Sequence, residues 1–299
     1  MTTTLTRDAD IAGIEVLLRA LKLPSFTAQY RATATRAEAE GWGFERYLRE
    51  LTEQEVSDRQ VRKIERIRTT SHLPPEKTLG NLDLARIPTK VKRLLPALCE
   101  GAFLERGENV LAFGLPGRGK THCLCAIGHE LVARGHAVLY VPAFKLVQSL
   151  LSAKRELALD REIRRLDRFD AVLIDDIGYV QQDREEMEVL FTFLAERYER
   201  RSVMITSNLI FSDWDKIFKD PMTTAAAIDR IVHHATILEM TGESFRTEAA
   251  LKRQRREQRR GEEVACKRGT ARCPPMGGRA QQAKDHPASG RADAPPEPP

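Results

Sequence analysis

The sequence predicts an α/β fold: a parallel sheet with helices on both faces, preceded by a small helical domain and followed by a disordered tail. Short apolar segments alternate with helical segments from about residue 106 to residue 251, which indicates strands joined by crossover helices. Helical periodicity dominates before this region, and no periodicity remains after Leu251. These three observations divide the chain into domains at 1–75, 76–251 and 252–299.

Residues 1–75 are predicted to form a helical N-terminal domain. Ile14, Leu17 and Leu21 recur at the spacing of one helix face, and Pro24 ends that segment. A second amphipathic run, 44–51, leads into the basic stretch Arg59–Arg68. This stretch either contacts DNA phosphates or forms a solvated helix face, and the sequence leaves both interpretations open.

Residues 76–251 are predicted to form the α/β domain. A connector, 76–105, carries short apolar clusters that we expect to pack onto the α/β region that follows; they include Leu79, Leu82, Leu84 and Ile87. The expected strands are 109–113, 137–141, 171–174 and 202–206, with a weaker fifth strand at 236–238. Their continuous apolar character is typical of strands buried on both faces of a parallel sheet. Helices are expected at 121–134, from the second strand through Leu151, and around 187–198.

The tail, 252–299, holds the basic excess of the chain. It contains 12 Lys and Arg against 6 Asp and Glu, a net charge of +6. Because the whole chain has a net charge of +5, residues 1–251 have a net charge of −1. The basic pI therefore gives no argument that the folded part binds DNA. Rich in Gly, Pro, Ala and Arg, the tail cannot bury enough apolar surface to offset its chain entropy, which predicts disorder.

Composition also narrows the class of protein. No apolar run reaches the roughly 18 residues needed to span a membrane, and the N-terminus lacks the apolar core of an export signal. Five cysteines stand at irregular positions without a disulfide framework. We therefore expect a cytoplasmic protein with reduced cysteines and no membrane partner.

Three groups of Cys and His residues could in principle bind a metal, but none of them is expected to form a metal site. Cys123 and Cys125 are expected to be small core residues. His233 and His234 are adjacent, so on a helix they would diverge by about 100° and are not expected to share a metal ion. The tail residues do not have zinc-finger spacing; they are Cys266, Cys273 and His286.

The strongest chemical signal is the segment GLPGRGKT, Gly114–Thr121, which fits G-x-x-x-x-G-K-[ST] between an apolar strand and a helix. Its glycines allow backbone N–H groups to surround phosphate oxygens, Lys120 reaches the β- and γ-phosphates, and the Thr121 hydroxyl ligates Mg²⁺. The glycine spacing argues against a dinucleotide fold. The cofactors predicted are ATP and Mg²⁺. The expected nucleotide contacts are Gly114, Leu115, Pro116, Gly117, Arg118, Gly119, Lys120, Thr121 and His122.

Polar residues follow two later strands, where the carboxyl edge of a parallel sheet forms the ligand crevice. We assign Asp175 to Mg²⁺, and Asp176 to orienting or deprotonating the attacking water. The alternative is that these acids begin a turn or cap a helix. Asn208 could contact the γ-phosphate or the water, or mark a turn.

Four segments together resemble the IstB-like ATP-binding proteins, AAA+ ATPases that assist the transposase of an insertion sequence. They are GLPGRGKTH, VLIDDIGY, VMITSNLIFSDW and AAAIDRIVHHATILEMTGESFR. The resemblance runs from about Leu17 to Arg246 and leaves out the tail. It implies a P-loop NTPase (AAA+) fold and ATP hydrolysis coupled to DNA binding and oligomer assembly. The implied partners are double-stranded DNA, a cognate transposase and further copies of the chain.

The resemblance also implies roles for single residues. Asp175 is the Mg²⁺-associated acid, and Asp176 is the catalytic position, where many AAA+ relatives have Glu. Asn208 is the sensor residue. Arg230 is the arginine finger that reaches a neighbouring subunit's γ-phosphate, its alternative being an exposed helix arginine. Arg246 is a second phosphate-sensing arginine.

Two other functions remain open. A replicative helicase loader shares this ATPase core and the Asp-Arg element, so the sequence does not separate it from a transposition helper. A small-molecule kinase also uses a phosphate loop. The acidic pair after one strand, the Ser-Asn pair after another and the Asp-Arg helix favour an ATPase over the kinase.

Overall fold

Five short apolar segments form one parallel sheet in the computed structural model, which describes residues 13–179, 184–209, 214, 221–241 and 244. Neighbouring strands are all parallel, in the order β2-β3-β4-β1-β5. β1 and β4 are buried along their whole length, as expected of strands covered on both faces. The five strands are β1 (Asn109–Phe113), β2 (Val138–Pro142), β3 (Ala171–Asp175), β4 (Ser202–Ser207) and β5 (Ala235–Glu239). The predicted α/β fold, including its fifth strand, is confirmed.

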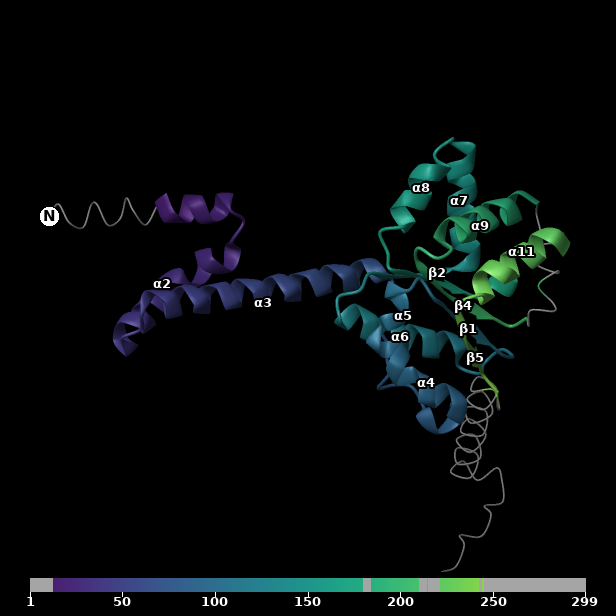
Figure 1. Ribbon diagram of the computed structural model, residues 1–299, viewed down its shortest axis with the longest axis horizontal. Helices are drawn as coiled ribbons and strands as arrows, with labels where there is room; N and C mark the ends of the chain where they lie inside the picture. The colour runs from purple at the N-terminus through teal and green to yellow at the C-terminus, as the bar shows by residue number, and fades with distance from the viewer. Residues whose placement is uncertain (1–12, 180–183, 210–213, 215–220, 242–243, 245–299) are drawn as a thin grey trace, which may run out of the picture. The chain divides into compact units, whose positions relative to one another are not determined.

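Helices cover both faces of the sheet (Figure 1). Successive side chains of a strand point to opposite faces, so Leu111 and Val110 enter different cores. One core contains residues of α7 (Ala143–Arg155), α8 (Leu159–Leu166), α9 (Arg184–Arg197) and α11 (Pro221–Val232). The other contains residues of α4 (Thr89–Glu100), α5 (Ala102–Glu105) and α6 (Lys120–Ala133).

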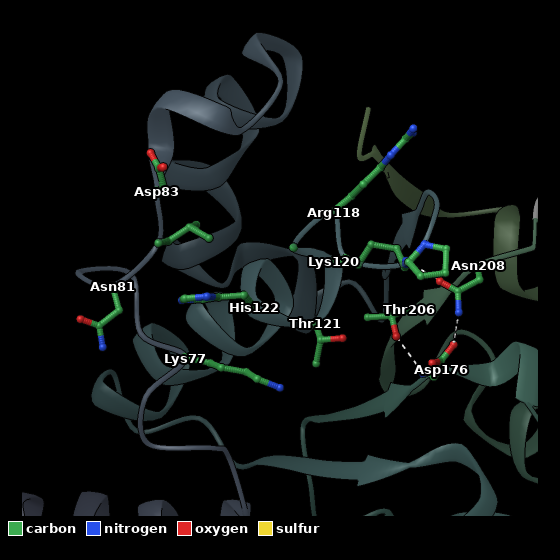
Figure 2. Close-up of a pocket in the computed structure, with 14 residues that line it drawn as sticks. Lys77, Asn81, Asp83, Arg118, Lys120, Thr121, His122, Asp176, Thr206 and Asn208 are labelled. Carbon is green, nitrogen blue, oxygen red and sulfur yellow. Dashed lines mark hydrogen bonds between the residues drawn. The ribbon is translucent and has the colours of Figure 1, made fainter. Parts of the chain in front are cut away.

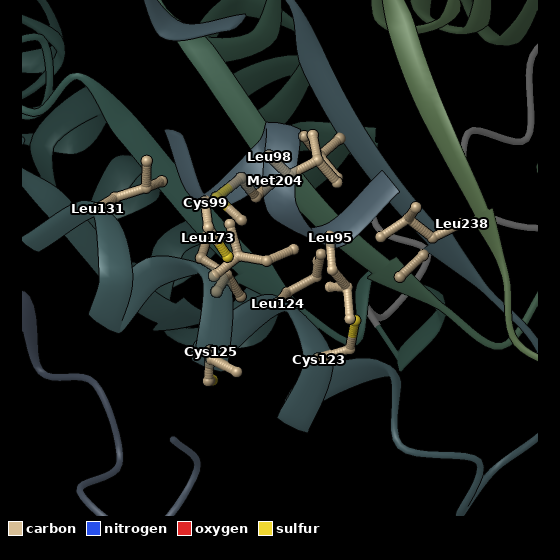
Figure 3. Packing of buried hydrophobic residues seen from close by; sticks show 14 of the residues in the cluster. Leu95, Leu98, Cys99, Cys123, Leu124, Cys125, Leu131, Leu173, Met204 and Leu238 are labelled. Atoms are coloured by element: carbon tan, nitrogen blue, oxygen red, sulfur yellow. The ribbon is translucent and has the colours of Figure 1, made fainter. Parts of the chain in front are cut away.

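The second core includes three cysteines among leucines and methionines (Figure 3). Cys99, Cys123 and Cys125 are buried and unpaired as thiols. Burial raises the pKa of both Cys123 and Cys125 to about 12, so neither thiol ionises near neutral pH. The prediction that Cys123 and Cys125 are core residues is confirmed.

The N-terminal region is helical, as predicted. Residues 13–20 form one helical segment, and Pro24 then occupies the first turn of α2 (Pro24–Glu40), where its missing N–H costs nothing. α2 packs on α3 (Phe44–Ser71). A buried Glu55 joins them: its carboxylate accepts the backbone N–H of Ser25 at 2.8 Å.

The connector departs from the prediction in part. It contains a short 3₁₀ turn (Leu84–Arg86) and the helices α4 and α5, none of which was predicted. α4 contains Pro96, a residue that is unfavourable inside a helix. The expected packing is confirmed for Leu82 and Ile87, which are buried, but is wrong for Leu84, which is exposed.

None of the helices among the described residues combines the length and the apolar character that crossing a membrane requires. The predicted tail, 252–299, lies outside the described residues.

Candidate nucleotide-binding site

The loop between β1 and α6 adopts the backbone conformation that its glycines permit. Gly114, Gly117 and Gly119 have φ angles of 146°, 80° and 85°, in the region that residues with a Cβ atom rarely enter. At Gly114 a Cβ atom would lie 2.3 Å from the backbone oxygen of Met240. The loop thus passes directly against the end of β5 and delivers the chain to the N-terminus of α6, which favours anions.

Lys120 begins α6, and only 6% of its surface is exposed. Its ammonium donates to the carbonyls of Gly114 at 2.6 Å and Leu115 at 3.1 Å. It also donates to Oδ1 of Asn208 at 2.5 Å. The lysine therefore stabilises the loop through hydrogen bonds to its carbonyl groups, and its charge lies beside Asn208, which follows β4. An ammonium placed in this way can form charge-assisted hydrogen bonds to phosphate oxygens.

Asp175, at the end of β3, accepts hydrogen bonds from hydroxyl groups of three other elements. Thr121 Oγ1 and Thr206 Oγ1 each donate to its Oδ1 at 2.7 Å, and the Tyr140 hydroxyl donates to its Oδ2 at 2.9 Å. Burial and the Asp175 charge raise the pKa of Tyr140, so this hydroxyl stays protonated. Thr121 and Asp175 thus bring together a hydroxyl and a carboxylate, the oxygen donors that suit Mg²⁺.

Asp176 has a left-handed backbone, with φ 65°, a conformation that Asp tolerates better than most residues. Its N–H donates to Thr206 Oγ1 at 2.8 Å. Its Oδ1 accepts from Asn208 Nδ2 at 2.7 Å. The Asn208 amide therefore bridges the Lys120 ammonium and the Asp176 carboxylate.

Several of these groups line a pocket of about 300 Å³ (Figure 2), whereas Gly114, Leu115 and Asp175 are not among its lining residues. The loop and the residues that follow two strands line one part of it, and the connector lines another. The lining residues are Lys77, Asn81, Leu82, Asp83, Pro116, Gly117, Arg118, Gly119, Lys120, Thr121, His122, Asp176, Thr206 and Asn208. Most of the predicted nucleotide contacts and both predicted catalytic strand-tip residues, Asp176 and Asn208, thus meet in one cavity.

The connector's share of the pocket was not predicted. Lys77, Asn81 and Asp83 line it, and His122 holds the connector in place because its Nε2 lies 3.0 Å from the Thr78 carbonyl oxygen. No motif marks these residues. The only signal in the sequence was the neighbouring apolar cluster, which predicted packing and no contact with a ligand.

The predicted arginines lie in different places. Arg118 lines the pocket and extends away from Asp176 in Figure 2, with its Nη1 3.4 Å from the Met240 carbonyl oxygen. Arg230 does not line this pocket; it lies on α11 with its guanidinium carbon 4.8 Å from the Phe191 ring centre. Arg246 lies outside the described residues.

The expectation for His233 and His234 is wrong in its geometry. α11 ends at Val232, so the two histidines occupy a turn and do not diverge as they would on a helix. Their ring centres are 4.1 Å apart. Together with Glu199 they place three potential metal-ligating atoms within 4.8 Å of one another.

The chain is similar to proteins whose names refer to ATP binding and to insertion sequences. The model of the family described as IstB-like ATP binding protein matches residues 16–254. A Sinorhizobium fredii protein, named as an insertion sequence ATP-binding protein, is 42% identical over 82% of this chain and 83% of its own. A Pseudomonas aeruginosa protein, named for insertion sequence IS21, is 36% identical over 78% of this chain and 88% of its own. A crystal structure of the DnaC helicase loader, 16% identical, covers 56% of this chain and 100% of its own with a TM-score of 0.48.

Proposed function

The chain belongs to the IstB-like ATP-binding protein family, and from this premise we propose that it is a DNA-associated ATPase assisting the transposase of an insertion sequence. The names of its relatives support the insertion-sequence setting over a helicase loader. Hydrolysis of ATP, the need for Mg²⁺ and the partners are parts of the proposal.

In this proposal the loop N–H groups and Lys120 bind the β- and γ-phosphates. Thr121 and Asp175 hold Mg²⁺, which supplies positive charge against the phosphate oxygens. Asp176 orients the attacking water or accepts its proton. The observation that carries the proposal is the Asn208 bridge, because it places a phosphate-binding cation and a carboxylate on either side of one amide.

The site is proposed to be completed by a second copy of the chain. Arg230 lies on α11 and does not line the pocket of its own chain. Supplied across an interface, it would stabilise charge on the transferred phosphoryl group, and hydrolysis would depend on assembly. Arg246 keeps its proposed role as a second phosphate-sensing arginine, at a position outside the described residues.

Contact with double-stranded DNA is proposed for the basic stretch of α3. Arg59 and Arg62 are about half exposed and both bond to the buried Glu55, at 2.8 and 3.2 Å. Glu55 thereby neutralises part of their charge. Lys63 and Arg66 are exposed on the same stretch, and we assign the phosphate contacts to these two residues first.

The test measures phosphate release from ATP with and without duplex DNA, using Lys120→Ala as the blank. We expect stimulation by DNA in the native chain. Asp176→Asn should keep ATP binding and lower turnover by about 10²- to 10⁴-fold, the usual range for loss of a general base. Asp175→Asn should instead raise the Mg²⁺ concentration that ATP binding requires.

Turnover that ignores DNA would remove the DNA-coupled part of the proposal and leave an ATPase with another partner. Equal turnover in Asp176→Asn and the native chain would remove Asp176 from the mechanism. Pull-down of the chain with transposase or with replicative helicase then separates the two settings that the sequence left open.

A further inference from the structure

A cluster of metal-ligating side chains lies away from the nucleotide pocket, at the amino edge of the sheet. Glu199 stands in the turn before β4, and His233 and His234 stand in the turn before β5. One ligating atom from each of the three lies within 4.8 Å of the others. All three residues are exposed, so an ion can reach them from solvent. Among the described residues this is the one cluster of three such groups.

The backbone that carries these ligands is fixed by the sheet. The His234 carbonyl accepts the N–H of Asn109, the first residue of β1, at 2.8 Å, and the His233 N–H donates to the Asp229 carbonyl at 2.9 Å. Glu199 has a left-handed backbone with φ 54°. Gly107 passes close beside it: a Cβ atom there would lie 3.0 Å from the Glu199 carbonyl carbon. The fold therefore sets the backbone positions of the three ligands before any ion binds.

A second residue orients one of the imidazoles. The Tyr198 hydroxyl lies 3.0 Å from His233 Nδ1. With that nitrogen engaged by the hydroxyl, Nε2 of His233 is the nitrogen left to ligate a metal. Histidines that bind metals commonly have their other ring nitrogen held in this way, which fixes the tautomer and the direction of the ring. His234 Nε2 lies 3.7 Å from Glu199 Oε1, so these two ligands already face one another.

We propose that Glu199, His233 and His234 form a binding site for a divalent transition metal, with Zn²⁺ the ion that fits best. Two imidazoles and one carboxylate are a common set of three protein ligands for zinc, with a fourth position open to water. Imidazole nitrogen suits zinc, copper and nickel, whereas Mg²⁺ requires mostly oxygen ligands. The site is thus distinct in chemistry from the Thr121–Asp175 pair.

A metal at this position would connect the chain after α9 to the chain after α11. The two helices already pack on each other, and Arg230 of α11 lies over Phe191 of α9. Zinc would add a further link between the two turns, which are already joined by the contact of Tyr198 with His233 and by the approach of His234 to Glu199. Bound zinc should therefore raise the melting temperature of the chain.

The test is calorimetric titration of the full chain with Zn²⁺ in the absence of ATP and Mg²⁺. We compare the native chain with a His233→Ala/His234→Ala double variant and with Glu199→Gln. The matched control is His72→Asn, because His72 is an exposed histidine elsewhere, with φ 53°, a conformation that Asn adopts readily. Equal melting temperatures without metal show that the exposed substitutions leave folding intact.

The native chain and His72→Asn should each bind one zinc ion that the double variant does not bind. Glu199→Gln should weaken that binding at least about tenfold, since it removes one of three ligands. Co²⁺ in place of zinc should give a visible absorption band in the native chain and in His72→Asn, and none in the His233→Ala/His234→Ala variant. Equal zinc stoichiometry and affinity in the native chain and the double variant would overturn the proposal, and would place any bound zinc on residues such as Cys266 and Cys273.

Discussion

The two edges of the sheet use their polar side chains differently. At the amino edge, two buried polar side chains, Arg197 and Asn109, bond mainly to backbone. Arg197, only 1% exposed, donates to three carbonyl oxygens, those of Leu166, Phe169 and Ser202, at 3.0 to 3.1 Å. Asn109 donates to the Ile231 carbonyl and accepts the Val203 N–H, both at 2.9 Å. Each of these bonds joins one strand or helix end to another.

At the carboxyl edge, several side chains bond to one another in addition to backbone. Asp175 accepts from three hydroxyls, and Asn208 joins Lys120 to Asp176. A bond between two side chains can be exchanged for a bond to a ligand oxygen without breaking a backbone connection. This difference indicates that the amino edge of the sheet stabilises the fold, while the carboxyl edge holds groups that a nucleotide can bind.

The largest expected effect tests the amino edge. Arg197→Leu removes three hydrogen bonds to carbonyl oxygens and the buried charge that makes them, and we expect it to lower the free energy of unfolding by about 3–5 kcal/mol. Burial lowers the pKa of Arg197 to about 10, so the native side chain is charged at neutral pH. Arg200→Ala is the matched control, because Arg200 also pairs with Asp167 but is 61% exposed. It should cost less than about 1 kcal/mol. Equal losses in urea unfolding would contradict the contrast between the edges.

The next effect tests the carboxyl edge. Lys120→Ala removes a cation that can bond to phosphate, and charged hydrogen bonds of this kind contribute about 1.5–3 kcal/mol. We expect ATP affinity to fall by about 10- to 150-fold, with a smaller change in unfolding free energy than Arg197→Leu produces. Binding of a fluorescent ATP analogue and urea unfolding measure the two quantities. A loss of stability equal to that of Arg197→Leu would show that Lys120 belongs with the residues that hold the fold.

The sequence predicted the carboxyl edge better than the amino edge for a physical reason. In a parallel sheet, strand ends meet at one edge, so Thr121, Asp175, Asp176 and Asn208 could be brought together from strand order alone. The bridge through Asn208 depends on rotamers and could not be predicted. The left-handed backbone of Asp176 also has no signature in the sequence.

The amino edge depends on contacts between segments far apart in the chain. His233 and Glu199 meet only because α11 ends at Val232 and β4 and β5 begin at the same level. A helical pattern that runs to the histidines hides that ending. The connector's contact with the pocket was missed in the same way: Lys77 and Asn81 reach it through a fold that no local pattern describes.

A smaller effect sharpens the contrast within the carboxyl edge. Tyr140→Phe removes one hydroxyl donor from Asp175, and a single hydrogen bond contributes about 1 kcal/mol. We expect the Mg²⁺ concentration for half-maximal ATP binding to rise by about fivefold. Tyr198→Phe is the control, because its hydroxyl contacts His233 at the amino edge and should leave this Mg²⁺ requirement unchanged. An unaltered requirement in Tyr140→Phe would mean that the two threonine hydroxyls alone position Asp175.

The smallest effect expected is the coupling between the edges. A five-residue strand spans about 16 Å, and substitutions separated by more than about 10 Å usually add to within about 0.5 kcal/mol. His234→Ala should therefore leave ATP affinity within about twofold of native, and Lys120→Ala should leave the zinc-dependent rise in melting temperature in place. The combined Lys120→Ala/His234→Ala variant should lose both ATP affinity and zinc binding, each by the same amount as in the corresponding single variant. A larger interaction would mean that the strands or α11 transmit strain between the edges, and the division of the sheet into a structural and a ligand-binding edge would fail.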